Sequence, residues 1–358
     1  MTNTLYILLV EDEDTKIDEW KDALESHNSD SDNLGFSIET AYAKTVLHAK
    51  RLLEKNLFDA VVVDLRLQIE PGVAESNTAG NELVRHVLQT QPVGVVIYTG
   101  QQAEVEAEHV SCPQLQVMDK ADGLPQIFDW LEKNLQVFIE LREAKATFNR
   151  ETAKIFYKSI WPRWKYWNEG KEEGRKLSSV VTRHIFAHVH DSLLHATDDA
   201  THSEESYFVP PLKARLDTGD LVDLDGKVWI IVSPRCDLAN PGKVQSIVLA
   251  GCDDISAKWN PLIGAGSKKK EEQCKRLIQH DGELKQHFLF PMISLDRGQR
   301  GPWMVLFHDL KVIPAADAAE QLIESRFASL SPMFVPSLVE RFGAYFSRIG
   351  TPGFSSDG

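Results

Sequence analysis

The chain has 358 residues, enough for two domains, and 42% of them are hydrophobic, which is ample for buried cores. The formal net charge is −14, and residues 1–150 hold 26 of the 53 acidic side chains but only 13 of the 39 basic ones. The first half therefore repels nucleic acid and anionic membranes, and the second half gives no support to general DNA binding.

Nothing in the sequence indicates export or membrane insertion. The N-terminus "MTNTLYILLVEDEDT" lacks a basic start, and no stretch approaches the roughly 18 apolar residues that a membrane helix needs. The four cysteines form no CxxC pair; they are Cys112, Cys236, Cys252 and Cys274. These features predict a cytoplasmic protein with reduced thiols and no membrane partner.

Strand and helix patterns alternate through the first 150 residues. Apolar or alternating runs predict strands at residues 5–10, 36–43, 58–64, 93–100 and 115–120. Helical spacing occupies the segments between and after them, at 14–27, 45–56, 79–90, a short polar helix at 101–110, and from Pro125 onward. Five such units predict an α/β fold with a doubly wound, five-stranded parallel sheet covered on both faces.

Reactive side chains follow four of these strands. Glu11 and Asp12 come after the first, Asp64 after the third, Thr99 ends the fourth, and Lys120 ends the fifth. The carboxyl ends of parallel strands meet at one edge, so these side chains are expected to converge. Three carboxylates suit Mg²⁺, a lysine pairs with phosphate, and a carboxylate can accept a phosphoryl group.

This set resembles the CheY-like receiver domain of two-component response regulators over residues 4–135. The resemblance rests on "LLVEDED", "VVVDLRL", "VVIYTG" and "QVMDKAD". It implies a phosphoacceptor, a switch hydroxyl, a phosphate-binding lysine, and a metal site that includes one backbone carbonyl. These roles fall on Asp64, on Thr99, on Lys120, and on Glu11, Asp12, Asp64 and the carbonyl of Arg66.

The resemblance also implies a function. It predicts a bacterial response regulator that takes a phosphoryl group from a sensor histidine kinase or phosphotransfer protein, with Mg²⁺ as cofactor. The chain has no kinase motif of its own. Beyond phosphoryl acceptance and autodephosphorylation, no enzymatic activity is implied.

Three departures from the family pattern bear on switching. Val117 stands where the family usually has an aromatic residue, and Ala121 stands where it usually has proline. The segment after Asp64, "LRLQIEPGVAESNTAGNE", is several residues longer than usual before the helix-starting glycine, expected at Gly80. The longer segment is expected to cover the site or to shape a partner surface.

A connector and a second domain follow the receiver core of residues 1–124. Residues 125–165 carry apolar positions three, four or seven apart, which predicts one long helix that could pair with its twin in a homodimer. Two helices with a break near 145–152 are the alternative. The tryptophans of "WPRWKYWNEG" suit an interdomain core or, less well, stacking on a base.

Residues 166–358 are predicted to form an α+β output domain with a small barrel-like part. A helix at 178–202 holds five histidines, among them the pair His190-Asp191, which is also found in HD metal phosphohydrolases. Ordinary interface histidines are the simpler interpretation. Extended runs with a hairpin turn at Asp225-Gly226 follow, and residues 326–350 are predicted to be helical.

The sharpest chemical candidate in this half is "IIVSPRCDLAN", which holds Cys236 and Asp237. A thiol nucleophile would need a histidine, and a zinc site would need further thiols such as Cys252 and Cys274. A buried structural thiol beside a turn-capping aspartate is the simpler alternative. The output domain is thus predicted to bind a protein or ligand, with a hydrolase- or nuclease-like enzyme and a nucleic-acid binder as alternatives.

Overall fold

The structure is a computed structural model that describes residues 3–106, 115–168, 176–195, 202–240, 242, 245–264, 266–294 and 297–347. The chain divides into two compact units, an N-terminal unit, Met1–Thr197, and a C-terminal unit, Asp198–Gly358. Within the described ranges, no helix combines the length and the apolar character needed to cross a membrane.

The N-terminal unit is built on a parallel sheet. Its strands are β1 (Asn3–Val10), β2 (Phe36–Ala43), β3 (Ala60–Val63), β4 (Gly94–Thr99) and β5 (Leu115–Asp119). They lie in the order β2-β1-β3-β4-β5, and all four pairings are parallel. This is the doubly wound order with the crossover between β1 and β3, so the predicted fold class is confirmed.

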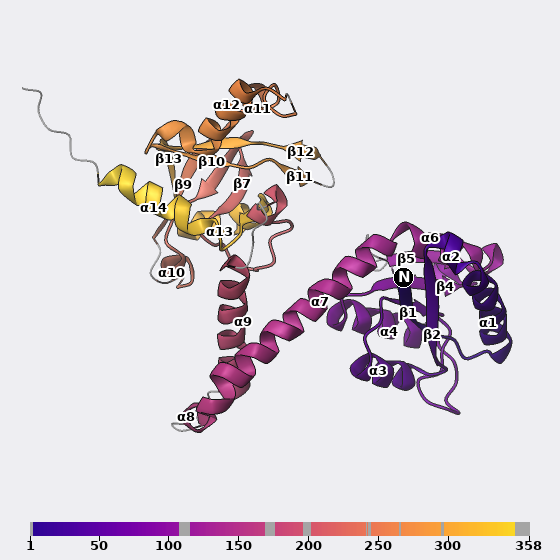
Figure 1. Ribbon diagram of the computed structural model, residues 1–358. Helices are drawn as coiled ribbons and strands as arrows, with labels where there is room; N and C mark the ends of the chain where they lie inside the picture. The colour runs from indigo at the N-terminus through magenta and orange to yellow at the C-terminus, as the bar shows by residue number, and fades with distance from the viewer. Residues whose placement is uncertain are drawn as a thin grey trace, which may run out of the picture. The chain divides into compact units, whose positions relative to one another are not determined.

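Helices cover both faces of this sheet (Figure 1). α3 (Val46–Lys55) and α4 (Asn77–Thr90) pack on one face, and α1 (Asp14–Ser29) and α6 (Pro125–Lys133) pack on the other. β3, "AVVV", is buried throughout because it lies in the middle of a sheet covered on both sides. Of the short helix predicted at 101–110, a 3₁₀ turn is present at Gln102–Glu104, and residues 107–114 lie outside the described residues.

The connector is helical but is not one helix. α6 ends at Lys133, α7 (Leu135–Ile155) begins at Leu135 with Asn134 between them, and a π-helical turn follows at Phe156–Ile160. The Asn134 side chain donates to the carbonyl of Trp130 at 2.8 Å, and this local bond competes with regular helix geometry. The break therefore lies near the start of the connector, and neither the unbroken helix nor the break at 145–152 is found.

The first half of α7 is fastened to the sheet by Arg142. Its guanidinium forms an ion pair with the carboxylate of Asp59 and donates to the carbonyl of Thr4 at 2.8 Å. The same carboxylate accepts from the backbone N–H of Tyr6 at 2.8 Å. Asp59 precedes β3, so α7 is anchored at the end of that strand opposite to Asp64.

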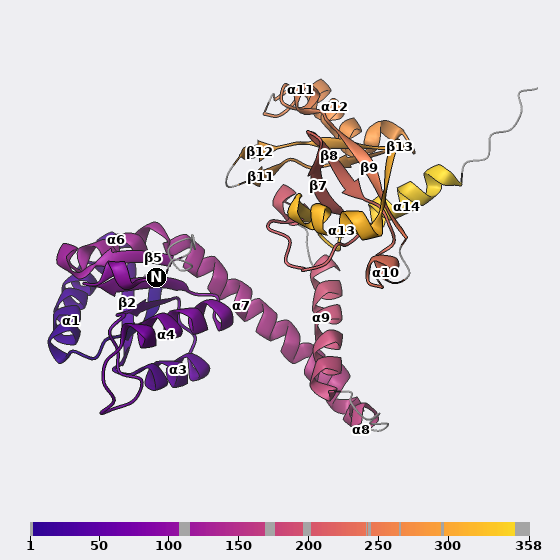
Figure 2. The ribbon, with the colours of Figure 1, turned by 180° about the vertical axis from the view of Figure 1, so that it is seen from behind.

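The second half of α7 pairs with α9 (Leu177–His195), which runs back along it (Figure 2). Ile155 and Val189 are buried between the two helices, and the Ser192 hydroxyl donates to Glu151 at 3.0 Å. A short helix, α8 (Trp164–Asn168), lies at the tip of this helical hairpin. Trp161 and Trp164 are 62% and 41% exposed there.

The C-terminal unit contains a seven-stranded sheet in which every pairing is antiparallel, so the predicted α+β class is confirmed. The strand order is β10-β13-β9-β8-β7-β14-β6, and β11 pairs with β12 in a separate hairpin. The strands are β6 (Tyr207–Phe208), β7 (Asp220–Leu224), β8 (Lys227–Ile231), β9 (Ser246–Asp254), β10 (Gln286–Leu289), β11 (Met292–Ser294), β12 (Gly298–Arg300), β13 (Trp303–Pro314) and β14 (Arg326–Leu330).

The C-terminal unit contains the predicted hairpin turn but only part of the predicted C-terminal helix. The hairpin between β7 and β8 turns at Asp225 and Gly226, which both have positive φ, as predicted. The prediction of a helix over 326–350 is wrong at its start, because residues 326–330 form β14 between β7 and β6. The helix there, α14 (Val335–Phe346), begins only after Pro332.

Candidate functional site

The strand order brings the predicted site residues of the N-terminal unit to one edge of the sheet. Ligand atoms of Glu11, Asp12 and Asp64 all lie within 4.8 Å of one another. Glu11 and Asp64 are 3% and 7% exposed. Such closely spaced, buried carboxylates repel one another unless a cation joins them.

Lys120 supplies one such cation. Its ammonium lies 2.7 Å from Glu11 Oε2 and 3.0 Å from Asp64 Oδ2. Burial alone would lower the pKa of Lys120, but the two carboxylates outweigh burial, and its pKa is raised. The lysine is therefore held charged between the acids.

One ammonium does not neutralise three carboxylates. Burial raises the pKa of Glu11, although Lys120 opposes this, and burial also raises the pKa of Asp12, with further contributions from neighbouring carboxylates. Both pKa values are raised, which means that ionising either carboxyl group costs free energy in this environment. A divalent cation with oxygen ligands would relieve that cost, so the donor set fits Mg²⁺.

Thr99 is the hydroxyl residue of the predicted site. Thr99 ends β4, which lies between the strands that carry Asp64 and Lys120, and it is 1% exposed. Its hydroxyl accepts from the backbone N–H of Gln101 at 3.2 Å and keeps its own proton for another acceptor. The backbone carbonyl of Arg66 as a metal ligand stays a prediction.

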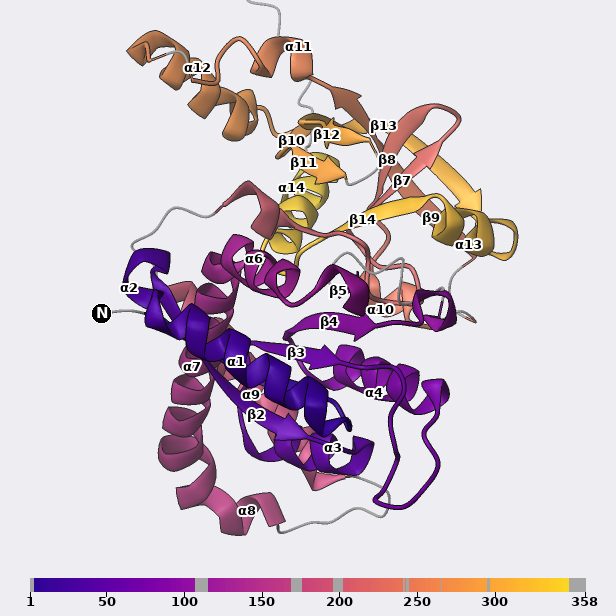
Figure 3. The same ribbon diagram turned by 90° about the vertical axis from the view of Figure 1, so that its right-hand side faces the viewer.

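The long segment after Asp64 folds back as a small hairpin beside α3 (Figure 3). Leu67 and Ser76 pair across it, and the amides of Val46 and Leu47 at the start of α3 donate to the carbonyls of residues 68 and 69. Within it, Arg66 Nε lies 2.8 Å from Glu75 Oε2. Glu75 also raises the pKa of Asp12, so the hairpin adds a carboxylate to the surroundings of the site.

Gly80 fixes how closely α4 approaches this edge. A Cβ at Gly80 would lie 2.3 Å from the backbone oxygen of Leu65, and the Gly80 N–H donates to that oxygen at 3.2 Å. Only glycine allows this approach. The helix itself begins at Asn77, two residues before the predicted range of 79–90, and Ser76 caps it.

Val117, where the family pattern usually has an aromatic residue, is a small side chain on the strand next to the one that ends in Thr99. Val117 pairs with Ile97 on β4 and packs on the same face as Ile97, two residues before Thr99. Tyr98 belongs to the opposite face of the sheet, where its ring is buried and its hydroxyl donates to the Lys120 carbonyl at 3.4 Å. Among the described residues of β4 and β5, no aromatic ring shares the face of Thr99.

Several solved structures match the N-terminal part of the chain. The N-terminal unit is similar to receiver domains. A signal receiver domain of an HD domain-containing protein from Pseudomonas fluorescens is 19% identical, with 40% of this chain and 95% of that chain covered and a TM-score of 0.31. The non-phosphorylated HemR receiver domain from Leptospira biflexa is 26% identical, with 36% and 92% covered and a TM-score of 0.27.

A complex of the histidine kinase ThkA with the response regulator TrrA also matches, at 17% identity, with 36% of this chain and 97% of that chain covered and a TM-score of 0.27. No family model and no curated protein matches the chain. Because these TM-scores are low, the receiver fold is recognised here by its strand order and by the side chains at the carboxyl edge.

The structure separates the residues of the candidate site around Cys236. Cys236 is exposed, so the prediction of a buried structural thiol is wrong. Its Sγ lies 3.6 Å from Asp237 Oδ1, and no histidine is among its hydrogen-bond partners in the described part of the chain. The Asp237 carboxylate caps no backbone amide there either; the turn is closed by backbone bonds to Pro234 and Asn240.

The two metal hypotheses for the second half are not supported. Within the described ranges, the acidic cluster of the N-terminal unit is the one group of three or more potential ligands close enough to hold an ion. Among the described residues, Cys236, Cys252 and Cys274 therefore form no zinc cluster, and His190 and Asp191 belong to no metal cluster. His190 is exposed on the surface of α9.

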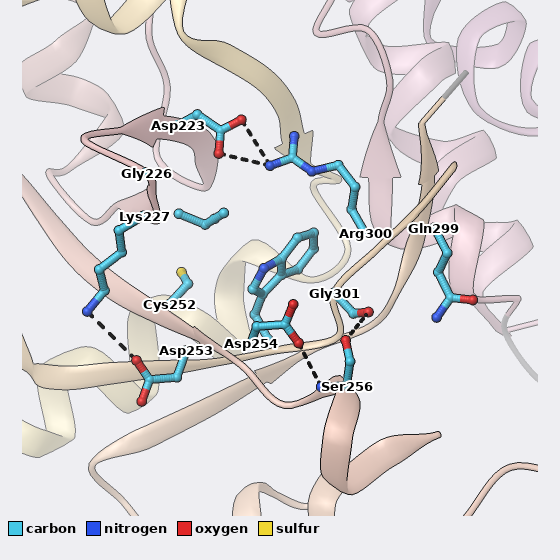
Figure 4. Close-up of a pocket in the computed structure, with 12 residues that line it drawn as sticks. Asp223, Gly226, Lys227, Cys252, Asp253, Asp254, Ser256, Gln299, Arg300 and Gly301 are labelled. Atoms are coloured by element: carbon cyan, nitrogen blue, oxygen red, sulfur yellow. Dashed lines mark hydrogen bonds and ion pairs between the residues drawn. The ribbon is translucent and has the colours of Figure 1, made fainter. Parts of the chain in front are cut away.

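The C-terminal unit does contain a polar cavity of about 740 Å³ that the sequence did not reveal (Figure 4). Arg300 pairs with Asp223 at 2.9 Å on one side, and Lys227 pairs with Asp309 at 2.5 Å and with Asp253 at 3.7 Å on the other. The cavity floor includes Cys252, whose pKa is raised by burial, so its thiol stays protonated and unreactive. The cations of this cavity are already paired with carboxylates of the same unit.

Proposed function

We propose that this chain is a response regulator in which Asp64 accepts a phosphoryl group and thereby controls the C-terminal unit. The observation that carries the proposal is the bridge formed by Lys120 between Glu11 and Asp64 beside Asp12. A purely structural lysine would need one carboxylate. This arrangement keeps an excess of buried negative charge that suits a metal ion and a phosphoryl group.

In the proposed reaction an oxygen of Asp64 attacks phosphorus and forms an acyl-phosphate bond. The phosphorus–nitrogen bond to a phosphohistidine breaks, and the histidine nitrogen recovers its electron pair and takes up a proton. Lys120 moves from the Asp64 carboxylate to a phosphoryl oxygen, and Thr99 donates its hydroxyl proton to another. The backbone N–H of Leu65, which lies 2.8 Å from Asp64 Oδ1, holds the carboxylate in place.

Glu11, Asp12 and Asp64 would hold Mg²⁺ at this edge. When bound, the ion neutralises the charge that builds up on the phosphoryl oxygens. The carboxylates orient the acceptor and exclude other anions, and Lys120 replaces part of the positive charge when the ion is absent. The raised pKa values of Glu11 and Asp12 support a cation-binding role, because an unneutralised cluster costs stability.

The proposed phosphoryl donor is a histidine kinase or phosphotransfer protein. The acceptor carboxylate is almost buried, so the donor must approach the loops at the carboxyl edge, including the hairpin of residues 65–76. The side chains of Arg66 and Glu75 on that hairpin are 60% and 37% exposed, so a donor can contact both charges of this pair. The C-terminal unit is proposed to act by binding a protein or ligand, and an enzymatic output is the alternative.

The experiment is intact mass spectrometry after incubation with acetyl phosphate, with and without Mg²⁺. The parent is expected to gain one phosphoryl group only with Mg²⁺, and hydroxylamine should remove it because it is an acyl phosphate. Asp64→Ala should gain none. Asp59→Asn is the matched control, because Asp59 lies at the other end of β3 and is also 7% exposed, and it should be modified like the parent. An unmodified parent would contradict the proposal.

A further inference from the structure

The first half of α7 presents an apolar stripe to solvent. Val137, Leu141 and Phe148 are 55%, 37% and 40% exposed, and Ala144 between them is also exposed. Their spacing is four, three and four residues, which places all of them along one line of the helix. Isolated exposed leucines are ordinary, but a continuous stripe at heptad spacing is the seam of a coiled coil.

The same line is already used for packing farther along α7. Three and seven residues after Phe148 it reaches Glu151 and Ile155. Glu151 accepts the hydrogen bond from α9, and Ile155 is buried against it. Among the residues that the structure describes, α9 therefore covers the half of the seam from Glu151 onward. The half from Val137 to Phe148 is bare except where the Phe148 ring contacts Phe186 of α9.

We infer that the bare half of the seam pairs with the same segment of a second copy of this chain, in parallel about a two-fold axis. Such a pairing is isologous, so each apolar residue meets its own counterpart and no second surface is needed. In heptad terms Val137 and Ala144 occupy d positions, and Leu141 and Phe148 occupy a positions. This pairing goes beyond the proposed function, because it requires no phosphoryl group.

The charges beside the seam suit this occupant. Glu140 precedes Leu141 at a g position, and Lys145 follows Ala144 at an e position. In a parallel pair, a g residue faces the e residue of the following heptad in the other helix, which joins a carboxylate to an ammonium on both sides. A like-charged pair at these positions would have opposed the pairing.

The apolar surface continues onto α9. Phe186 and Leu193 are 57% and 44% exposed, and they lie one heptad apart with the exposed His190 between them. The rings of Phe148 and Phe186 are in contact, with centroids 5.8 Å apart. The stripe on α9 thus joins the end of the α7 seam, and His190 is assigned to an interface instead of to a metal site.

The first test is the mass of the full chain in solution over a range of concentrations, by sedimentation equilibrium. The parent is expected to dimerise, and Leu141→Lys is expected to weaken the dimer at least about 100-fold, because it places two ammonium groups in an apolar seam. Leu57→Lys is the control; it changes an equally apolar, 64% exposed side chain outside the seam and should leave the dimer intact. A monomeric parent, or a Leu141→Lys variant that still dimerises like the parent, would overturn the inference.

Cross-linking tests the parallel register. In a Cys236→Ser background, Ala144→Cys should form a disulfide-linked dimer under mild oxidation, because d positions of a parallel pair face each other. Glu143→Cys, one residue away and pointing off the seam, should not. Equal cross-linking at both positions, or none at Ala144→Cys, would overturn the parallel arrangement. Only variants whose thermal unfolding midpoint equals that of the parent are compared.

The charge pair provides a second test of the register. Glu140→Lys should weaken the dimer about 10-fold, because it places two ammonium groups opposite each other, and adding Lys145→Glu should restore the affinity.

Discussion

Replacing Asp12 by asparagine should stabilise the N-terminal unit when no divalent cation is present. The ligand oxygens of Asp12, Glu11 and Asp64 lie within 4.8 Å of one another. At that distance two unit charges repel by about 3.5 kcal/mol at an effective dielectric constant of 20 and by about 0.9 kcal/mol in water. Asp12 is partly exposed, and Lys120 offsets one of its two neighbours, so we expect a gain of about 1–2 kcal/mol.

The gain should depend on pH in a defined direction. The folded pKa of Asp12 is raised above its ordinary value of 3.8, mainly by burial, so the folded protein binds this proton more tightly than the unfolded chain does. The charged carboxylate therefore costs stability above its folded pKa, and that cost disappears as the pH falls below 3.8. The advantage of asparagine should be full at pH 7.5 and should vanish near pH 3.5.

Calorimetry with and without Mg²⁺ measures this. In the parent, the unfolding transition of the N-terminal unit is the one that moves to higher temperature with Mg²⁺. At 100 times the Kd, Mg²⁺ should add about 2.7 kcal/mol to its free energy of unfolding. In Asp12→Asn that transition should start higher and respond much less to Mg²⁺. Asp18→Asn, on the exposed side of α1, should behave like the parent. A destabilised Asp12→Asn at pH 7.5, or an unchanged response to Mg²⁺, would refute the picture of a strained cation site.

Three further predictions follow from single contacts. Gly80→Ala should lose at least about 2 kcal/mol in urea unfolding, because its Cβ would overlap a backbone oxygen; Gly343→Ala, in open helix surface, should gain about 0.5–1 kcal/mol instead. Arg142→Met should cost about 1–3 kcal/mol, because it leaves a buried carboxylate without its cation; an unchanged midpoint would contradict this. Iodoacetamide should alkylate native Cys236 at least about 10-fold faster than Cys252, as peptide mass analysis would show.

The N-terminal fold and site could be predicted because each signal is local. The segment "VVVDLRL" predicts a buried strand that ends in a carboxylate. The strand order then brings Asp64 close to Glu11 and Lys120. The order of strands is itself limited to a few arrangements once alternation is recognised. The arrangement of side chains at this edge therefore follows from short sequence patterns.

The features that were missed depend on contacts between distant segments. Nothing near Asn134 marks it as a break, since its neighbours continue the apolar spacing and only its own side chain bonds back to the helix. Residues 326–330 adopt a strand because β7 and β6 lie on either side of them, and tertiary pairing overrides local preference. The exposure of Cys236 likewise follows from how the turn after β8 is placed, which no motif records.

The two proposals meet on β3. This strand is four buried residues long, with Asp64 at one end and Asp59 at the other. Asp59 is fixed on both sides, by the Tyr6 amide of β1 and by its own carbonyl, which accepts from Gly94 of β4 at 2.9 Å, and it carries Arg142 of α7. Four buried strand residues therefore separate the acidic edge from the anchor of α7, with no intervening loop. The seam that would join two copies begins on that same helix, so β3 and the Asp59–Arg142 ion pair lie between Asp64 and the proposed dimer contact.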